Sequence, residues 1–110
     1  MKKQRLLPVS PHPIVRAERL IGDRWSLSIL YDIFLGIRRF CLLQKDLGIA
    51  SNILSNRLQQ LVEGGLLQPA APTCGATHAE YVLTRRGAAL QPVIVALGRW
   101  AEENPPVQPE

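Results

Sequence analysis

The chain has 110 residues, 46% of them hydrophobic, and 13 basic against 9 acidic side chains leave a net charge of +4. Such a length suits one domain with a single core, and such a composition argues against disorder. No stretch is long and apolar enough for a membrane helix, and the early prolines argue against a secretory leader. We expect a soluble, cytoplasmic protein whose charge favours an anionic partner.

We expect one domain over residues 13–103, between a flexible basic arm at 1–12 and a disordered tail at 104–110. Pro13 suits the first position of a helix, and the apolar residues up to Ile21 share one face of it. The next stretch, "RWSLSILYDIFLG", is apolar nearly all round. That pattern predicts a helix at the centre of the core.

Two short amphipathic helices are predicted next, over residues 38–47 and 51–63. Gly48 should end the first, and Ser51 is expected to be the N-cap of the second. Gly64 and Gly65 supply a left-handed turn after the second helix. Its inner face carries leucines at i, i+4 and i+7, namely Leu54, Leu58 and Leu61. Two short helices joined by a glycine-containing turn indicate a helix-turn-helix.

Residues 66–71 and 79–84 are predicted to form two strands around a loop rich in proline and glycine, with Pro69 on an edge strand. Thr84 suits the N-cap of a last helix, which Pro92 should kink. A helix pair followed by a hairpin is typical of a winged helix-turn-helix. The expected fold is therefore mainly α, or α+β, with about five helices and a two-stranded β-hairpin wing.

The outer face of the helix at 51–63 carries amides and hydroxyls and is almost free of carboxylates. Carboxylates would be repelled by phosphates, whereas Asn and Gln pair with adenine, and Ser and Arg reach bases or phosphates. A solvated face on an ordinary helix is the alternative, but the neighbouring helix, turn and hairpin favour double-stranded DNA. The predicted DNA-binding residues are Arg38, Arg39, Lys45, Ser51, Asn52, Ser55, Asn56, Arg57, Gln59 and His78.

The segments "LIGDRW", "GIRRF", "SNILSNRLQQL", "GGL" and "YVLTRRG" follow one another in this order. From about Pro13 to Ala101 the chain resembles the HxlR-type winged helix-turn-helix transcriptional regulators of bacteria. The resemblance implies a DNA-binding homodimer, associated with the nucleoid, whose subunits meet through their first and last helices.

The last helix also has more apolar surface than a domain of this size covers alone, which a two-fold dimer would bury. The predicted dimer interface comprises Ile14, Ala17, Leu90, Val93, Ile94, Leu97, Trp100 and Ala101.

Two positions depart from the family pattern. Family members often carry a cysteine just before the proline that starts the first helix, and in some it senses oxidants or electrophiles. Here His12 stands at that place, so redox sensing there is unsupported. The family's wing is also richer in arginine, whereas this chain offers only His78 near the expected position. Affinity for DNA is therefore expected to depend more on the helix than on the wing.

No nucleophile motif, phosphate-binding loop or metal-ligand spacing occurs, so we expect neither an enzyme nor a bound metal or cofactor. His12 is interpreted as an inert surface histidine. Cys41 and Cys74 are interpreted as reduced thiols, with Cys41 buried, although the spacing is also compatible with a disulfide between them.

The sequence therefore predicts a homodimeric, sequence-specific transcriptional regulator that binds an inverted-repeat operator. A winged-helix adaptor that binds protein instead of DNA is the alternative. A small-molecule effector near Trp25 or Trp100, between the core and the dimer helices, would add to DNA binding and not replace it.

Overall fold

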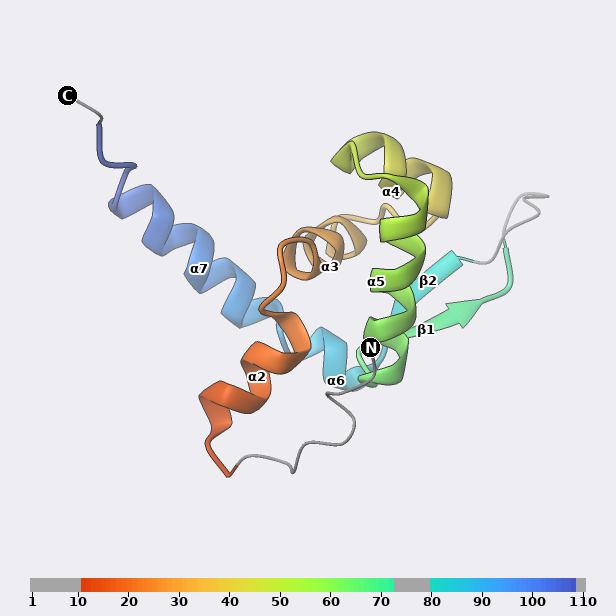
Figure 1. The fold of residues 1–110 in the computed structure, drawn as a ribbon, viewed down its shortest axis with the longest axis horizontal. Coiled ribbons are helices and arrows are strands. Elements are labelled where there is room, and N and C mark those ends of the chain that lie inside the picture. The colour runs from red at the N-terminus through yellow and green to blue at the C-terminus, as the bar shows by residue number, and fades with distance from the viewer. Residues whose placement is uncertain (1–10, 73–79, 109–110) are drawn as a thin grey trace.

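The computed structural model describes residues 11–72 and 80–108. Within them, four helices precede a hairpin and two helices follow it (Figure 1). The elements are α2 (Pro13–Ile21), α3 (Ser26–Phe34), α4 (Phe40–Leu47), α5 (Ser51–Glu63), β1 (Leu67–Ala70), β2 (Glu80–Leu83), α6 (Arg85–Ala88) and α7 (Gln91–Glu103). Apart from the four-residue α6, the described part therefore contains the five helices and two strands that the sequence predicts. Most of the predicted arm lies outside the described residues.

The core lies where α3, α4, α5 and the base of the hairpin meet. The predicted stripe of α5 is confirmed, since Leu54 and Leu58 are fully buried and Leu61 is 1% exposed. The other buried hydrophobic residues are Ile29, Leu30, Ile33, Leu43, Ile49, Leu66 and Leu67. Neither α2 nor α7 contributes a buried residue.

Helix α3 is less enclosed than its composition predicts. One side of it is buried in the core, but Tyr31 is 51% exposed and Leu35 is 61% exposed. The buried side also includes the carboxyl of Asp32, which is only 4% exposed. The apolar content of this segment therefore serves the core on one side and leaves apolar surface on the other.

Helix α5 begins at Ser51, and its N-cap is Ala50, which makes no side-chain cap. The prediction of Ser51 as the N-cap is therefore wrong by one residue. The predicted left-handed end is confirmed at Gly65, where φ is +79°. The Leu66 N–H donates to the Leu61 carbonyl at 2.9 Å, and the Gly65 N–H donates to the Val62 carbonyl at 3.0 Å. These two bonds form a Schellman motif, which turns the chain directly into β1.

Strands β1 and β2 pair antiparallel, with Leu67 opposite Leu83 and Pro69 opposite Tyr81. The chain before α4 adds a short bridge to this sheet, because Arg39 pairs with Glu80 and the Tyr81 N–H donates to the Arg38 carbonyl at 3.0 Å. The hairpin is thereby joined to the start of the helix-turn-helix.

The predicted last helix is divided into α6 and α7, and the expected kink is a break. Pro92 lies in the first turn of α7, where it has no N–H to donate and its ring would clash with the carbonyl of Ala88, the last residue of α6. Thr84 is the N-cap of α6, as predicted. Its hydroxyl accepts from the Gly87 N–H at 3.0 Å and donates to the Gly65 carbonyl at 2.6 Å.

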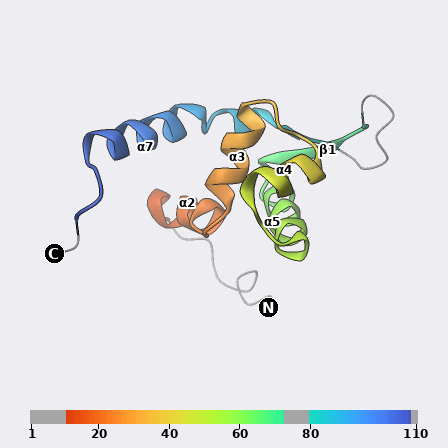
Figure 2. The same cartoon turned by 90° about the horizontal axis from the view of Figure 1, so that it is seen from above.

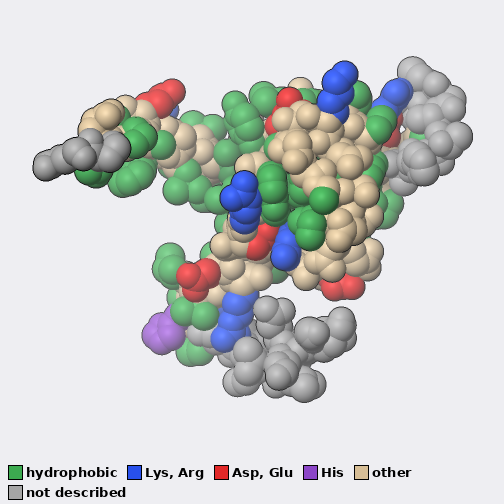
Figure 3. Space-filling view, turned by 45° about the horizontal axis from the view of Figure 1, so that its top comes forward, with side chains coloured by type: hydrophobic (Ala, Val, Ile, Leu, Met, Phe, Trp, Pro, Cys, Tyr) green, Lys and Arg blue, Asp and Glu red, His purple; other side chains and the backbone are tan. Residues whose placement is uncertain are grey.

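Helix α7 projects from the body on the side away from the hairpin (Figures 1 and 2). Its packing against the rest of the chain is mainly against α3. Hydrophobic side chains lie along this projecting arm (Figure 3). No helix in residues 11–72 and 80–108 has the length and hydropathy needed to cross a bilayer.

Candidate nucleic-acid interface

Helices α4 and α5 are joined by the three residues Gly48, Ile49 and Ala50. Gly48 has a φ of +65°, a left-handed conformation that glycine adopts without strain. Ile49 is 3% exposed, so the middle of the turn is anchored in the core. The buried Ile49 thus fixes the angle between α4 and α5 from the core side. The outer face of α5 remains exposed on the surface.

The outer face of α5 is polar over its first two turns. Ser51, Asn52, Ser55, Asn56 and Gln59 are all exposed. At 3.6 residues per turn, positions 52, 55, 56 and 59 fall within an arc of roughly 100°, opposite the leucine stripe. Structure and sequence therefore agree on which side of α5 is free to contact a partner.

The amides on this face differ in their partners. The Gln59 amide donates to the Glu63 carboxylate at 3.1 Å, near the C-terminal end of the helix. Within the described residues, the side chains of Asn52 and Asn56 make no hydrogen bond. The amides of Asn52 and Asn56 are therefore available to hydrogen-bond with a partner molecule. The one acidic side chain on this face, Glu63, lies at the C-terminal end of α5.

Arg57, which the sequence places beside the polar face of α5, makes contacts within its own chain. Its side chain is 29% exposed, and its Nε lies 3.5 Å from Oδ2 of Asp23, in the segment between α2 and α3. A terminal nitrogen of the same guanidinium donates to the Gln60 side chain. Arg57 therefore attaches α5 to the start of α3, a contact between distant parts of the chain that no local pattern indicates.

Asp23 is held as a carboxylate at this junction. Burial raises its pKa, but hydrogen bonds from Ser26 and the Trp25 N–H and the charge of Arg57 outweigh burial, so the pKa lies below its ordinary value. The Trp25 and Ser26 N–H groups donate to Oδ2 at 3.0 and 3.1 Å. Asp23 thus satisfies the first N–H groups of α3 and pairs with α5 at once.

The basic residues before and on α4 are not equivalent. Arg38 and Lys45 are exposed. The Arg39 Nε lies 3.3 Å from Oε2 of Glu80, a residue that is only 8% exposed. Arg39 therefore neutralises a buried carboxylate of the hairpin, in addition to any contact with a partner.

Helices α3 and α4 hold a pair of carboxyl groups that sequence reasoning missed. Oδ2 of Asp32 has no hydrogen-bond partner in the described part of the chain. Burial, together with the hydrogen bond and the charge of the neighbouring Asp46 carboxyl, raises the pKa of Asp32 to about 6. Because Asp32 and Asp46 lie on different helices, no local sequence pattern indicates that their carboxyl groups are neighbours.

Other predicted residues have mixed outcomes. His78 and Cys74 lie outside the described residues. Cys41 is exposed on α4, so the expectation that it is buried is wrong.

Among the predicted dimer residues, Leu90 and Ile94 are half-buried against their own core. The exposed members of that set are Ile14, Ala17, Val93, Leu97, Trp100 and Ala101.

A helix pair with a three-residue turn, followed by a two-stranded hairpin bonded to the start of its first helix, defines a winged helix-turn-helix protein. Residues 20–109 match the HxlR-like helix-turn-helix family, and the chain belongs to that family.

Among curated relatives, the chain is similar to an HTH-type transcriptional regulator of Mycobacterium bovis, with 43% identity over 91 residues. That alignment covers 83% of this chain and 58% of the relative, so the chain spans little more than half of the relative's length. An HTH-type transcriptional regulator of Synechocystis sp. is 32% identical over 97 residues, covering 84% of this chain and 72% of the relative.

Solved structures show the same arrangement. The crystal structure of PA1607 superposes with a TM-score of 0.82 at 42% identity, covering 92% of this chain and 70% of that one. The reduced form of the transcriptional regulator YodB from B. subtilis superposes with a TM-score of 0.73 at 26% identity, covering 88% and 95%. The predicted fold and family are therefore confirmed.

Proposed function

We propose that the protein is a homodimeric transcriptional regulator that binds an inverted-repeat operator in double-stranded DNA. The observation that carries the proposal is the outer face of α5, where exposed amides and hydroxyls have no carboxylate among them until Glu63. Membership of a helix-turn-helix family whose curated relatives are named transcriptional regulators supports it.

In this proposal the N-terminal turns of α5 enter the major groove. Asn52 and Asn56 pair with base edges, and Ser51 and Ser55 reach bases or phosphates. Arg38 and Lys45 neutralise backbone phosphates beside the groove. Arg57 is expected to position α5 through Asp23 and not to read a base itself.

The two copies are proposed to meet through α2 and α7. Val93 is 44% exposed, Leu97 is 47% exposed and Trp100 is 63% exposed, and the three share one face of α7. Pairing these faces by a two-fold axis would bury that surface and present two α5 helices to successive major grooves. The half-sites are then expected roughly 34 Å apart, which is one turn of DNA.

The test begins with selection of bound duplexes from a random pool, which yields the operator and its half-site spacing. Fluorescence anisotropy is then measured on the operator and on random duplex over a salt series. Asn56→Ala should cost about 1–3 kcal/mol on the operator and little on random DNA. Lys45→Ala should weaken both equally and lower the salt slope by about 0.9.

The matched control is Gln91→Ala, which removes an exposed amide from α7, away from the proposed groove contact. It should leave both affinities unchanged. Absence of salt-sensitive binding to any duplex would refute the proposal and favour a protein-binding adaptor.

A further inference from the structure

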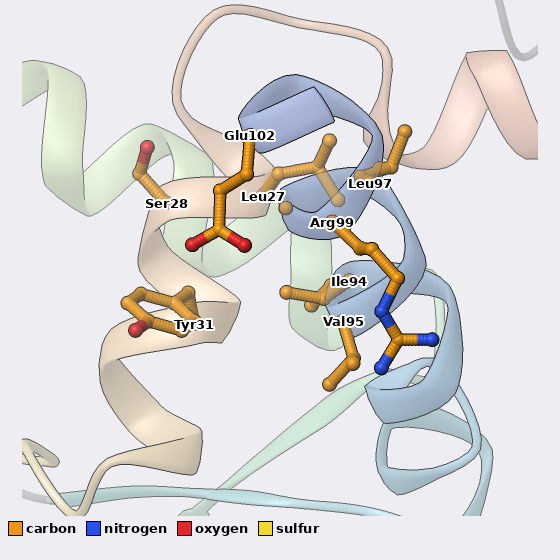
Figure 4. A pocket seen from close by; sticks show the side chains of 9 residues that line it. Leu27, Ser28, Tyr31, Ile94, Val95, Leu97, Arg99 and Glu102 are labelled. Atoms are coloured by element: carbon orange, nitrogen blue, oxygen red, sulfur yellow. The ribbon is translucent and has the colours of Figure 1, made fainter. Parts of the chain in front are cut away.

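A cleft of about 580 Å³ lies between α3 and α7 (Figure 4). Leu27 and Tyr31 form the α3 side, and Ile94 and Val95 form much of the α7 side. A volume of several hundred cubic ångströms with mainly apolar walls and a few polar groups is typical of small-molecule sites. The cleft is open along one side, so a ligand can enter without unfolding either helix.

The floor of the cleft on α7 is a glycine. A Cβ added at Gly98 would meet no heavy atom within 4 Å. Glycine inside a helix is less stable than alanine, so nothing in the packing of the single chain explains this residue. Its missing side chain adds to the free space of the cleft.

The charged groups at the cleft point in different directions. The Glu102 carboxylate points across the gap toward Tyr31 and Ser28, whereas the Arg99 side chain extends along the other side of α7 (Figure 4). Within the described residues, Glu102 forms no ion pair. The cleft therefore presents an aromatic ring, a hydroxyl and a carboxylate that faces the gap, whereas the Arg99 guanidinium is directed away from that carboxylate (Figure 4).

The cleft and the proposed dimer contact share Leu97, but most of the α7 wall of the cleft lies on another face of the helix. At 3.6 residues per turn, the direction of Ile94, Gly98 and Glu102 is roughly 130° from that of Val93, Leu97 and Trp100. A second copy that packs on the latter face leaves the wall formed by Gly98 and Glu102 uncovered.

We propose that this cleft binds a small organic cation with an apolar body, whose charge pairs with Glu102 and whose body packs on Tyr31, Leu27 and Ile94. The bound cation bridges α3, which packs on α4, to α7, which carries the dimer contact. Its binding fixes the angle between them and so changes operator affinity. The regulatory consequence rests on the proposed function, but binding of the cation does not.

The probe is tetraphenylphosphonium, with tetraphenylborate as an anion of the same shape. Isothermal titration calorimetry without DNA should detect the phosphonium and at least tenfold weaker binding of the borate. Glu102→Gln should weaken phosphonium binding about tenfold. Glu103→Gln removes the same charge one residue away, outside the cleft lining, and should change it less than twofold. Gly98→Leu should fill the cleft and abolish binding, whereas Gly98→Ala should retain most of it.

Equal binding of the two probes, or equal effects of the two glutamate changes, would overturn the proposal. Absence of phosphonium binding to the wild type would also overturn it. If the Gly98→Leu variant then became monomeric in sedimentation equilibrium, the occupant of the cleft would be a second copy of the chain. Operator anisotropy without any cation tests DNA binding separately. If the protein binds the phosphonium but no duplex DNA, only the proposed function is refuted. If it binds DNA but not the phosphonium, only the proposed cation site is refuted.

Discussion

The inner helices α3, α4 and α5 and the outer helices α2 and α7 use their apolar residues in opposite ways. Every fully buried hydrophobic side chain on a described helix belongs to the inner set, whereas Ile14 on α2 is 79% exposed and Trp100 on α7 is 63% exposed. Helix α2 has nine residues, and a helix that short is marginal without packing. The difference teaches that the inner helices supply the core of the single chain, whereas the outer helices leave most of their apolar surface exposed on it.

The largest effect should come from the inner set. Leu58→Ala removes a fully buried side chain and should lower the free energy of unfolding by about 2–5 kcal/mol, because it leaves a cavity as well as losing apolar burial. Urea denaturation at a dilution where the chain is monomeric measures it. Trp100→Ala is the counterpart, and it should change monomer stability by less than about 0.5 kcal/mol. Equal losses in the two variants would erase the distinction between the two sets.

The outer set should matter for assembly. Leu97→Glu combined with Trp100→Glu places charges on the proposed dimer face, and the dimer dissociation constant should rise at least about 100-fold. Sedimentation equilibrium measures it, and circular dichroism checks that the helices remain. The control is Val107→Glu, since Val107 is 94% exposed beyond the end of α7. A dimer that tolerates both charges would place the contact elsewhere.

A smaller effect is expected at the carboxyl pair of the inner set. The pKa of Asp32 is raised from 3.8 to about 6, so the folded chain holds this proton more tightly than the unfolded one. Stability from this group is full below pH 3.8 and is lost as the pH rises through 6. Asp32→Asn should therefore stabilise the protein by on the order of 2 kcal/mol at pH 7.5 and by little at pH 3.5.

Urea titrations at those two pH values measure the difference. Glu63→Gln, which removes an exposed carboxylate on α5, is the matched control for the loss of one negative charge. A gain from Asp32→Asn that is the same at both pH values would contradict the raised pKa.

The smallest effect should be the coupling of Arg57 to Asp23. The side chains are 29% and 24% exposed, so solvent still screens the pair. A double-mutant cycle with Arg57→Gln and Asp23→Asn should give a coupling energy of about 0.5–1 kcal/mol, reduced by salt. Chemical denaturation of the four variants supplies the cycle. Additive losses would mean that the ion pair does not stabilise the position of α5.

The sequence predicts those parts of the fold that depend on local signals. The spacing of Leu54, Leu58 and Leu61 identifies the buried side of α5, and the left-handed turn at Gly65 follows from glycine's freedom. The N-cap of α5 lies one residue before the predicted Ser51, because Ser51 is a good N-cap by residue type, whereas the extended backbone is at Ala50. The sequence predicts a kink at Pro92, whereas the structure has a break between α6 and α7, because the ring of Pro92 also excludes a helical carbonyl at Ala88, four residues earlier.

The candidate site was predicted in part for the same reason. The polar face of α5 follows from helical periodicity, so Asn52 and Asn56 could be found without a structure. The pairings of Arg57 with Asp23 and of Arg39 with Glu80 join segments far apart in the chain, and local patterns carry no information about them. A basic residue near a groove and a basic residue inside an ion pair look alike in sequence.

The segment 20–23, at the end of α2 and just after it, approaches α5 and its C-cap at two places. A methyl group of Leu20 lies so close to Gly64 that a Cβ there would be 2.8 Å from it, and Asp23, two residues after α2 ends, pairs with Arg57. A rotation of the segment 20–23 would therefore act on the middle of α5, at Arg57, and on its C-cap, at Gly64. Substitutions far from the double helix, in the segment 17–23, are thus expected to alter how the protein sits on its target.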